Sequence, residues 1–333
     1  MAPLSKWIDT VPAGGRVSDA ARASLEARLA TVAYWLPLAA RQINDDVEKV
    51  HQLRVATRRA IAAVDLYRDW LPRRKARWLE RRLKKIRRAA GAARDLDVLA
   101  EWLRSELDGQ AGSLLAMLGD ERAAAQPKIM SVADQCEAEN RFRRKMYGLL
   151  ADVRPRGKVR KKQDVSFRNW AEMRLGQAAE SFFAALPSAN SDLSALHQFR
   201  IRGKHLRYTL ELLAPAFRPE LREQQYPVVQ ELQELLGRIN DCVAADERLR
   251  RWRRKIDAVY EQGLLDTLVE HKRRQLDEAI AEYRNWWTAE RAEPLQQGLT
   301  GLIGPVEASS RIDELAVVDE TPENSAESAV GQS

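Results

Sequence analysis

The sequence has few of the residues that build disulfide frameworks, metal sites or irregular folds: two cysteines, four histidines, 16 glycines and 13 prolines among 333 residues. Cys136 and Cys242 lie far apart, which argues against a disulfide framework and a thiolate metal site and favours a reducing, cytoplasmic setting. Residues 1–16 contain no apolar run of signal-peptide length. No segment approaches the roughly 20 uncharged residues that a membrane span needs. We therefore expect no membrane partner, no metal site and no bound cofactor.

Alternating runs of β-branched residues are also missing, whereas Ala, Leu, Glu and Arg are abundant. This composition predicts an all-α protein, and the 45% of hydrophobic residues can supply a substantial core. Breaks between helices are expected at prolines, because proline removes a backbone donor and clashes with the preceding turn. The expected breaks are at Pro72, Pro155, Pro187, Pro215 and Pro219.

The formal net charge of +7 understates how basic the folded part is. From Pro305 onward the chain has seven acidic side chains against Arg311 alone, a net of −6. Without this segment the net charge is about +13. A surface of this sign attracts polyanions such as nucleic acid, anionic lipid or inorganic polyphosphate. Solubility alone is the plainer explanation of such a charge.

The most informative pattern is an internal repeat with an offset of 146 residues. It pairs His51 with His197, Arg54 with Arg200, Arg58 with Lys204, Gly91 with Gly237, and Asp95 with Asp241. The separation between His51 and Gly91 equals that between His197 and Gly237, so chance is a poor explanation of the repeat. We therefore predict an internal duplication that folds as two four-helix bundles related by pseudo-twofold symmetry. We expect Asp95 and Asp241 to cap or brace a helix junction after each glycine.

The duplication predicts the following division of the chain. Residues 1–17 are an irregular N-terminal lead-in, 18–153 the first bundle, 154–164 a basic linker, 165–304 the second bundle, and 305–333 an acidic tail that we expect to be disordered.

The repeated segments have the spacing of amphipathic helices with one apolar and one cationic line. The apolar lines are Val50, Leu53, Thr57, Ala60 and Val64 in the first copy, and Leu196, Phe199, Gly203, Leu206, Leu210 and Leu213 in the second. The cationic line is centred about 120° around the helix from the apolar one, at the border of the packed interface. Such a row presents cations every 5 to 6 Å or so, and a chain of phosphates can follow it. A solvated helix face with partial ion pairing is the alternative.

The segment 73–88 is the strongest charge feature, because ten Arg and Lys residues there face a single acid, Glu80. Leu79, Leu83, Ile86 and Ala90 leave it one apolar stripe. Self-repulsion on such a helix costs stability unless an anion or neighbouring carboxylates offset it. The corresponding part of the second half is not basic and has Arg238 as its main cation. Binding is therefore expected to be stronger on the first half.

The two His-Gln-hydrophobic-Arg segments, each followed by Gly-x-x-(Arg/Asn)-Asp, resemble the CHAD domain family, over about residues 18–300. The resemblance implies two pseudo-symmetric helical bundles, a basic surface that binds inorganic polyphosphate, and association with cytoplasmic polyphosphate granules. The polyphosphate-binding residues that the resemblance and the charge pattern together predict are His51, Arg54, Arg58, Arg81, Lys84, Lys85, Arg88, Arg94, His197, Arg200, Lys204, Arg207, Tyr208 and Arg238. Asn240 stands where the first copy has Arg94.

Three other functional classes remain to be weighed. An enzyme would need a nucleophile, a paired carboxylate site or a metal cluster, and the sequence offers none of these patterns, so we expect a protein that is not an enzyme. DNA or RNA binding through the same basic helices is the main alternative, since phosphates of either polymer suit them. Recruitment of other granule proteins through the acidic tail is compatible with polyphosphate binding.

Overall fold

The computed structural model describes residues 5–9, 11–41, 47–107, 112–156, 165–188, 191–256 and 258–304, and within these ranges the chain forms α-helices and no β-strand. The all-α prediction is confirmed. The helices are α1 (Val17–Arg41), α2 (Val47–Leu66), α3 (Arg73–Glu106), α4 (Gly112–Glu137), α5 (Arg141–Leu150), α6 (Phe167–Phe183), α7 (Leu193–Leu213), α8 (Tyr226–Arg253), α9 (Val259–Trp286) and α10 (Ala289–Leu302).

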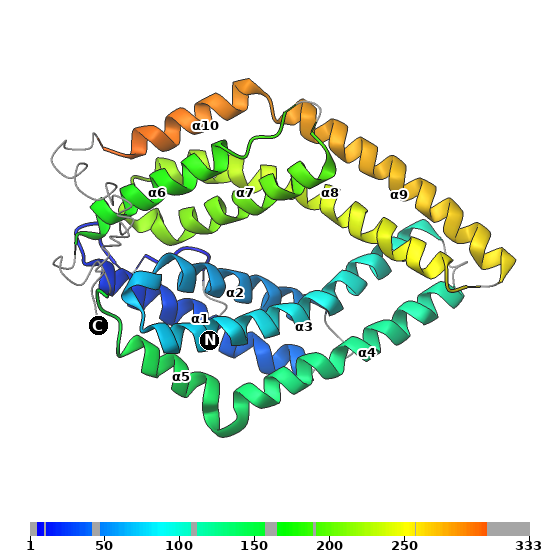
Figure 1. Ribbon diagram of the computed structural model, residues 1–333, viewed down its shortest axis with the longest axis horizontal. Helices are drawn as coiled ribbons and strands as arrows, with labels where there is room; N and C mark the ends of the chain where they lie inside the picture. The colour runs from blue at the N-terminus through cyan, green and yellow to red at the C-terminus, as the bar shows by residue number, and fades with distance from the viewer. Residues whose placement is uncertain are drawn as a thin grey trace, which may run out of the picture.

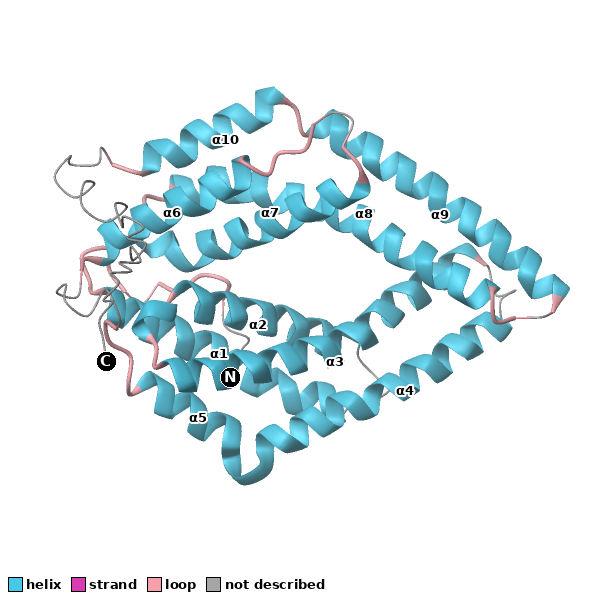
Figure 2. Cartoon of the chain, in the orientation of Figure 1, coloured by secondary structure: helices cyan, strands magenta, loops and turns pink. Residues whose placement is uncertain are grey.

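The helices lie in two groups, α1–α5 and α6–α10, which occupy the lower and upper parts of Figure 1. Each group has five α-helices among the described residues, where the sequence predicts four. In the first group the additional helix arises because α4 and α5 are separated at Glu139 and Asn140, whose φ angles are 52° and 54°. No proline or glycine marks this break, so the sequence pattern does not predict it. The helices are drawn again, without the colour gradient, in Figure 2.

Each of the five prolines predicted to break helices lies between two helices. Pro72 is the residue before α3, Pro155 and Pro187 follow α5 and α6, and Pro215 and Pro219 lie between α7 and α8. The prediction of a helix junction after Gly91 is wrong, because α3 continues through this position to Glu106. Gly237 likewise lies inside α8. A helical glycine costs only about 1 kcal/mol relative to alanine, which the packing of a long helix can offset.

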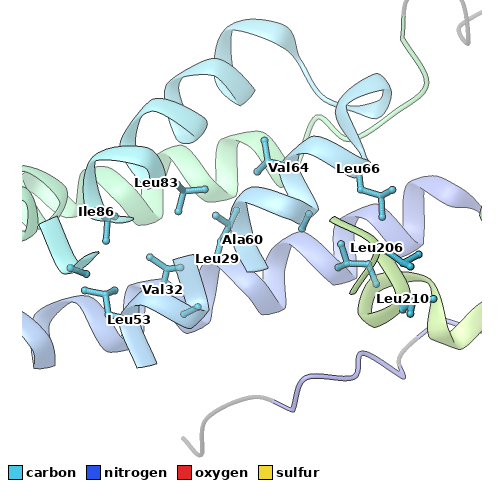
Figure 3. Close-up of a cluster of buried hydrophobic side chains, with 14 of the residues drawn as sticks. Leu29, Val32, Leu53, Ala60, Val64, Leu66, Leu83, Ile86, Leu206 and Leu210 are labelled. Atoms are coloured by element: carbon cyan, nitrogen blue, oxygen red, sulfur yellow. The ribbon is translucent and has the colours of Figure 1, made fainter. Parts of the chain in front are cut away.

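The two predicted apolar lines form the buried faces of α2 and α7. Every residue of both lines is buried, with Leu53, Phe199 and Leu206 completely so. The apolar stripe predicted on α3 is buried as well. Figure 3 shows side chains of α1, α2 and α3 together with Leu206 and Leu210 of α7, and all of them belong to one hydrophobic cluster. The two groups of helices therefore share a core.

A buried charge cluster joins the two groups at one end of the molecule. Glu211 of α7 is 1% exposed and accepts hydrogen bonds from Arg59 of α2 at 2.7 and 3.2 Å and from the Tyr226 hydroxyl at 2.8 Å. Arg28 of α1 lies 3.9 Å from the same carboxylate. Burial acts to lower the pKa of Arg59, but the charge and hydrogen bonds of Glu211 outweigh it and raise that pKa. Four helices are thus tied to one carboxylate.

A second set of contacts joins the groups at the opposite end, where α3 and α4 meet α8 and α9 (Figure 1). Glu121 of α4 accepts from Arg248 at 2.6 Å and from the indole nitrogen of Trp252 at 2.8 Å. Glu106 of α3 lies 2.8 Å from His271 of α9. The two groups therefore also touch at this second place.

Residues 11–16 precede α1 without helical structure, and Arg16 pairs with Ser166 in an isolated β-bridge. The predicted linker is described only at Arg154–Arg156, and the rest of it lies outside the described residues, as does the predicted acidic tail 305–333. Of the described helices, none is both long enough and apolar enough to cross a membrane.

Replacing Glu211 with Ala is expected to destabilise the protein by about 3–5 kcal/mol, because the buried Arg28 and the partly buried Arg59 lose their counter-charge. Urea unfolding followed by circular dichroism measures this change in the free energy of unfolding. Glu180→Ala is the control, since Glu180 is exposed on α6, and it should stay within about 0.5 kcal/mol of the unmodified protein. Equal effects of the two substitutions would contradict the role of Glu211.

Candidate anion-binding site

A cavity of about 760 Å³ lies between the two groups of helices, with walls from α2, α3, α7, α8 and α9. Ten Arg and Lys residues line it, against five Asp and Glu residues. The cavity is thus a concentrated region of positive charge. The basic lining residues are Arg54, Arg58, Arg94, Arg200, Lys204, Arg207, Arg238, Arg248, Arg251 and Lys272.

Helical spacing places the cations of α2 and α7 on the cavity wall. Arg54 and Arg58 are one turn apart on α2, and Arg200, Lys204 and Arg207 follow each other at steps of four and three on α7. Both rows flank the buried apolar lines, so the packing that buries those lines turns the cations toward each other across the cavity. The sequence predicts these rows, and the structure brings them together at one site.

Lys204 lies at the centre of this positive charge. Burial, together with the neighbouring guanidinium groups of Arg58, Arg200, Arg54 and Arg207, lowers the pKa of Lys204 from 10.5 to about 6. Its amine is therefore largely neutral at pH 7 while the cavity holds no anion. An anion in the cavity would favour the charged amine and raise this pKa.

The guanidinium groups near Lys204 also lack some of the counter-charges and hydrogen-bond acceptors that would offset their burial. Burial and the charge of Arg54 lower the pKa of Arg58, which has no ion pair within the described residues. Burial lowers the pKa of Arg200 as well, although Asp241 opposes this. The Nε atoms of Arg200 and Arg207 are buried without a hydrogen-bond partner. Such unpaired donors are costly unless a ligand accepts from them.

Three of the lining arginines do have carboxylate partners, one of them being Arg248, which is held by Glu121. Arg54 donates to Asp95 at 2.6 Å, and Arg238 donates to Glu282. Asp95 was expected to brace a helix junction, and instead it holds Arg54 across the gap between α2 and α3. Since Asp95 is 53% exposed, this pair is partly screened by solvent.

His51 and Arg94 complete the part of the lining that the sequence predicts. His51 is half-buried, and burial lowers its pKa, with Arg94, Arg54 and Arg58 acting in the same direction and Glu48 opposing them. Arg94 lines the same cavity from α3 and has no ion pair within the described part of the chain.

The structure keeps six predicted residues out of the cavity lining. His197 is exposed and lines a separate pocket of about 200 Å³, which shares Arg200 and Asn240 with the cavity. Tyr208 is buried and accepts a hydrogen bond from Arg207 at 3.2 Å, so it positions Arg207. The remaining four, Arg81, Lys84, Lys85 and Arg88, lie in the N-terminal half of α3.

The chain is similar to a known family and to solved structures. The family model described as "CHAD domain" matches residues 23–250, more than two thirds of the chain. The chain belongs to the CHAD domain family. The matched span runs from α1 through most of α8, and so includes the repeated segments and most of the cavity wall.

Solved structures give the same fold. The crystal structure of the CHAD domain from the plant Ricinus communis is 22% identical, with a TM-score of 0.63, and the alignment covers 90% of this chain and 97% of that one. PptA from Streptomyces chartreusis is 18% identical, with a TM-score of 0.59 and coverage of 81% and 98%. A search among curated proteins gives no match.

Several lining residues of this CHAD domain were not predicted from the sequence, Lys272 and Gln233 among them. Lys272 of α9 is 8% exposed, stands 3.8 Å over the ring of Trp102 and donates to Gln275 at 2.8 Å. Gln233 of α8 is buried with neither amide atom hydrogen-bonded. The repeat could not reveal Lys272, because the residue 146 positions earlier is Gln126, a buried side chain that binds backbone carbonyls of α1.

We predict that the Cε carbon of one lysine, followed by NMR, titrates with a midpoint near pH 6 and that this signal is lost in Lys204→Arg. Because the pKa of an unfolded lysine is near 10.5, the CHAD domain should become less stable as pH falls from 10.5 to about 6 through this group. Adding inorganic tripolyphosphate should move the midpoint upward. A Lys204 midpoint above pH 9 without anion would contradict the buried position of this amine.

Proposed function

We propose that this CHAD domain binds inorganic polyphosphate in the cavity between its two groups of helices. One observation carries the proposal: the cations of α2 and α7 face each other across the cavity, and Arg58 and Lys204 have no carboxylate partner within the described residues. A linear chain of phosphates supplies closely spaced negative charges that can contact both rows at once. The polyphosphate binding implied by the family resemblance is consistent with this chemistry.

The same proposal includes a duplicated architecture, with α2 and α7 as equivalent helices. These helices begin at Val47 and Leu193, which is the 146-residue offset of the sequence repeat. Near-equivalent bounds also relate α4 to α9. Two copies of one amphipathic helix, packed face to face, would explain why cations converge on a single cavity.

We further propose that the protein binds polyphosphate without transforming it and is located at cytoplasmic polyphosphate granules, where other granule proteins can be partners. Two of the five lining carboxylates, Asp95 and Glu282, are engaged as ion-pair acceptors. An acid or base for catalysis would need a carboxylate free to exchange a proton with the bound chain.

Nucleic acid is the second candidate ligand, because phosphates of DNA or RNA suit the same basic helices. The cavity favours a single linear anion, since its cations converge from opposite walls rather than spread over an open face. A duplex carries its phosphates on the outside of a wide rod and would reach the exposed arginines of α3 more readily.

Replacing Arg58, Arg200 and Lys204 together with Gln is expected to weaken polyphosphate binding by about 100-fold or more, because charge-assisted hydrogen bonds contribute about 1.5–3 kcal/mol each. Filter binding at several salt concentrations measures both affinity and the salt slope, which should fall by about two. The matched control changes Arg273, Arg274 and Arg284 of α9 to Gln, since these do not line the cavity. Equal losses in both variants would reject the cavity as the site.

Competition at fixed salt separates the two ligands. Labelled long-chain polyphosphate bound to the protein is challenged with unlabelled polyphosphate or duplex DNA at equal phosphate concentration. We expect polyphosphate to compete at a concentration at least about tenfold lower, because only a single strand reaches both cavity walls. Equal competition would favour the nucleic-acid function.

A further inference from the structure

Lys204 lies on the cavity wall between two other cations of α7. Arg200 precedes it by four residues and Arg207 follows it by three, so about one helical turn separates each guanidinium group from the amine. Arg58 of α2 is close enough to act on the same amine from the other group of helices. The amine is therefore flanked by groups that bind phosphate oxygens well.

The Lys204 amine is open to a reagent that enters the cavity. Within the described residues it has no hydrogen bond and no ion pair, and its side chain is only partly buried. The cavity volume of about 760 Å³ is large enough for a small organic anion. Because burial and the flanking guanidinium groups lower the pKa of Lys204 to about 6, its amine keeps a lone pair at pH 7. Lysines placed next to other cationic groups act as nucleophiles for this reason.

Lys272, the other lysine among the described lining residues, has different surroundings. It is 8% exposed and its amine donates to Gln275 at 2.8 Å. Burial lowers the pKa of Lys272, but neighbouring groups that include Glu106 and Asp241 oppose this. After burial, the strongest influences on Lys204 are instead four guanidinium groups. Of these two lysines, Lys204 is the one that combines an unengaged amine with adjacent phosphate-binding groups.

These surroundings suit a phosphate that carries an acyl group. An acyl phosphate joins a carbonyl carbon to a phosphate leaving group and carries about two negative charges near neutral pH. Guanidinium groups about 4.5–6 Å away along the helix can hold the phosphate, so that the carbonyl carbon comes within reach of the amine. A second guanidinium group can stabilise the negative charge that develops on the carbonyl oxygen.

We propose that Lys204 is a modification site that small acyl phosphates acylate directly in the cavity. The Nζ atom forms a bond to the carbonyl carbon, and the bond between that carbon and the bridging oxygen breaks. Inorganic phosphate leaves with one proton from the amine, so atoms and charge balance without any oxidant or further co-reactant. The product is an uncharged amide on the cavity wall.

Acylation of Lys204 would oppose polyphosphate binding, and this consequence rests on the proposed function. A polyphosphate chain brings many negative charges, so it favours the protonated amine and gains an ion pair that the amide cannot form. An acyl phosphate brings about two charges to four guanidinium groups and leaves more of the amine neutral. Bound polyphosphate should therefore protect Lys204, and acylated Lys204 should weaken polyphosphate binding.

Peptide mass spectrometry of the full chain, incubated with acetyl phosphate near neutral pH, measures acetylation at each lysine. Lys204 is expected to react at least about tenfold faster than Lys128, an exposed lysine of α4, because nucleophilic attack needs the neutral amine. It should also react faster than Lys272. Excess tripolyphosphate should slow the reaction at Lys204 and leave Lys128 unchanged. A rate at Lys204 no higher than at Lys128 would overturn the proposal.

Arg58→Gln tests whether the cavity cations hold the phosphate of the donor as well as activating the amine. Loss of this cation should raise the pKa of Lys204 and slow acetylation by any donor, so p-nitrophenyl acetate, which has no phosphate, is the reference. The ratio of the Lys204 rates with acetyl phosphate and with p-nitrophenyl acetate should fall about tenfold or more. Arg284→Gln of α9, outside the cavity lining, should keep the ratio. An unchanged ratio in Arg58→Gln would reject binding of the donor by its phosphate.

Polyphosphate affinity before and after acetylation separates this proposal from the proposed function. The acetylated protein should bind about tenfold more weakly, whereas Lys204→Arg, which lacks the reactive amine, should keep its own affinity after the same treatment. If Lys204 is acetylated selectively and the affinity does not change, the modification site stands and the proposed function of the cavity fails. If Lys204 resists acetylation while the Gln variant of Arg58, Arg200 and Lys204 loses polyphosphate affinity, the modification site is overturned and the proposed function stands.

Discussion

Like charges on α2 and α7 face each other across one cavity, and the rest of the molecule must hold them there against their repulsion. Arg58 and Lys204 lie where burial and neighbouring guanidinium groups both disfavour the charged state, and the pKa of Lys204 falls to about 6 as a result. The Glu211 cluster opposes this repulsion from within the core, because it ties α1, α2, α7 and α8 to one buried carboxylate. Glu106 and Glu121 join α3 and α4 to α9 and α8 at the other end of the molecule. The cations are thus fixed in position before any ligand arrives.

In such an arrangement the electrostatic repulsion between the cations lowers the stability of the fold. The relief of that repulsion then contributes to the free energy of ligand binding. A ligand that brings several negative charges relieves repulsion on both walls, satisfies the buried Nε atoms of Arg200 and Arg207, and favours protonation of Lys204. A single phosphate could relieve only part of this. On the proposed function, the cavity would therefore favour polyanions over simple anions by its geometry as well as by its net charge.

The two halves contribute unequally to the charged surface although they share the cavity. The first half adds the exposed arginines of α3, whereas the second half has Gln230, Glu231 and Glu234 at the corresponding part of α8. Both α2 and α7 contribute cations to the cavity wall, Arg54 and Arg58 from the first and Arg200 and Lys204 from the second. The outer surfaces differ because no packing constraint acts on them, so charge there can change without loss of the fold.

The sequence by itself determined the helical class, the buried lines of α2 and α7, and the cationic lines beside them, because these depend on helical periodicity and composition, which are local. It also carried the family motifs. Only the tertiary structure decided which cations meet. The packing of helices that are distant in sequence places Lys272 and Gln233 at the cavity and His197 in a separate pocket. No local sequence pattern encodes the distances between side chains of such helices. The break at Glu139 and Asn140 and the continuity of α3 through Gly91 were likewise decided by packing, which outweighs weak local preferences.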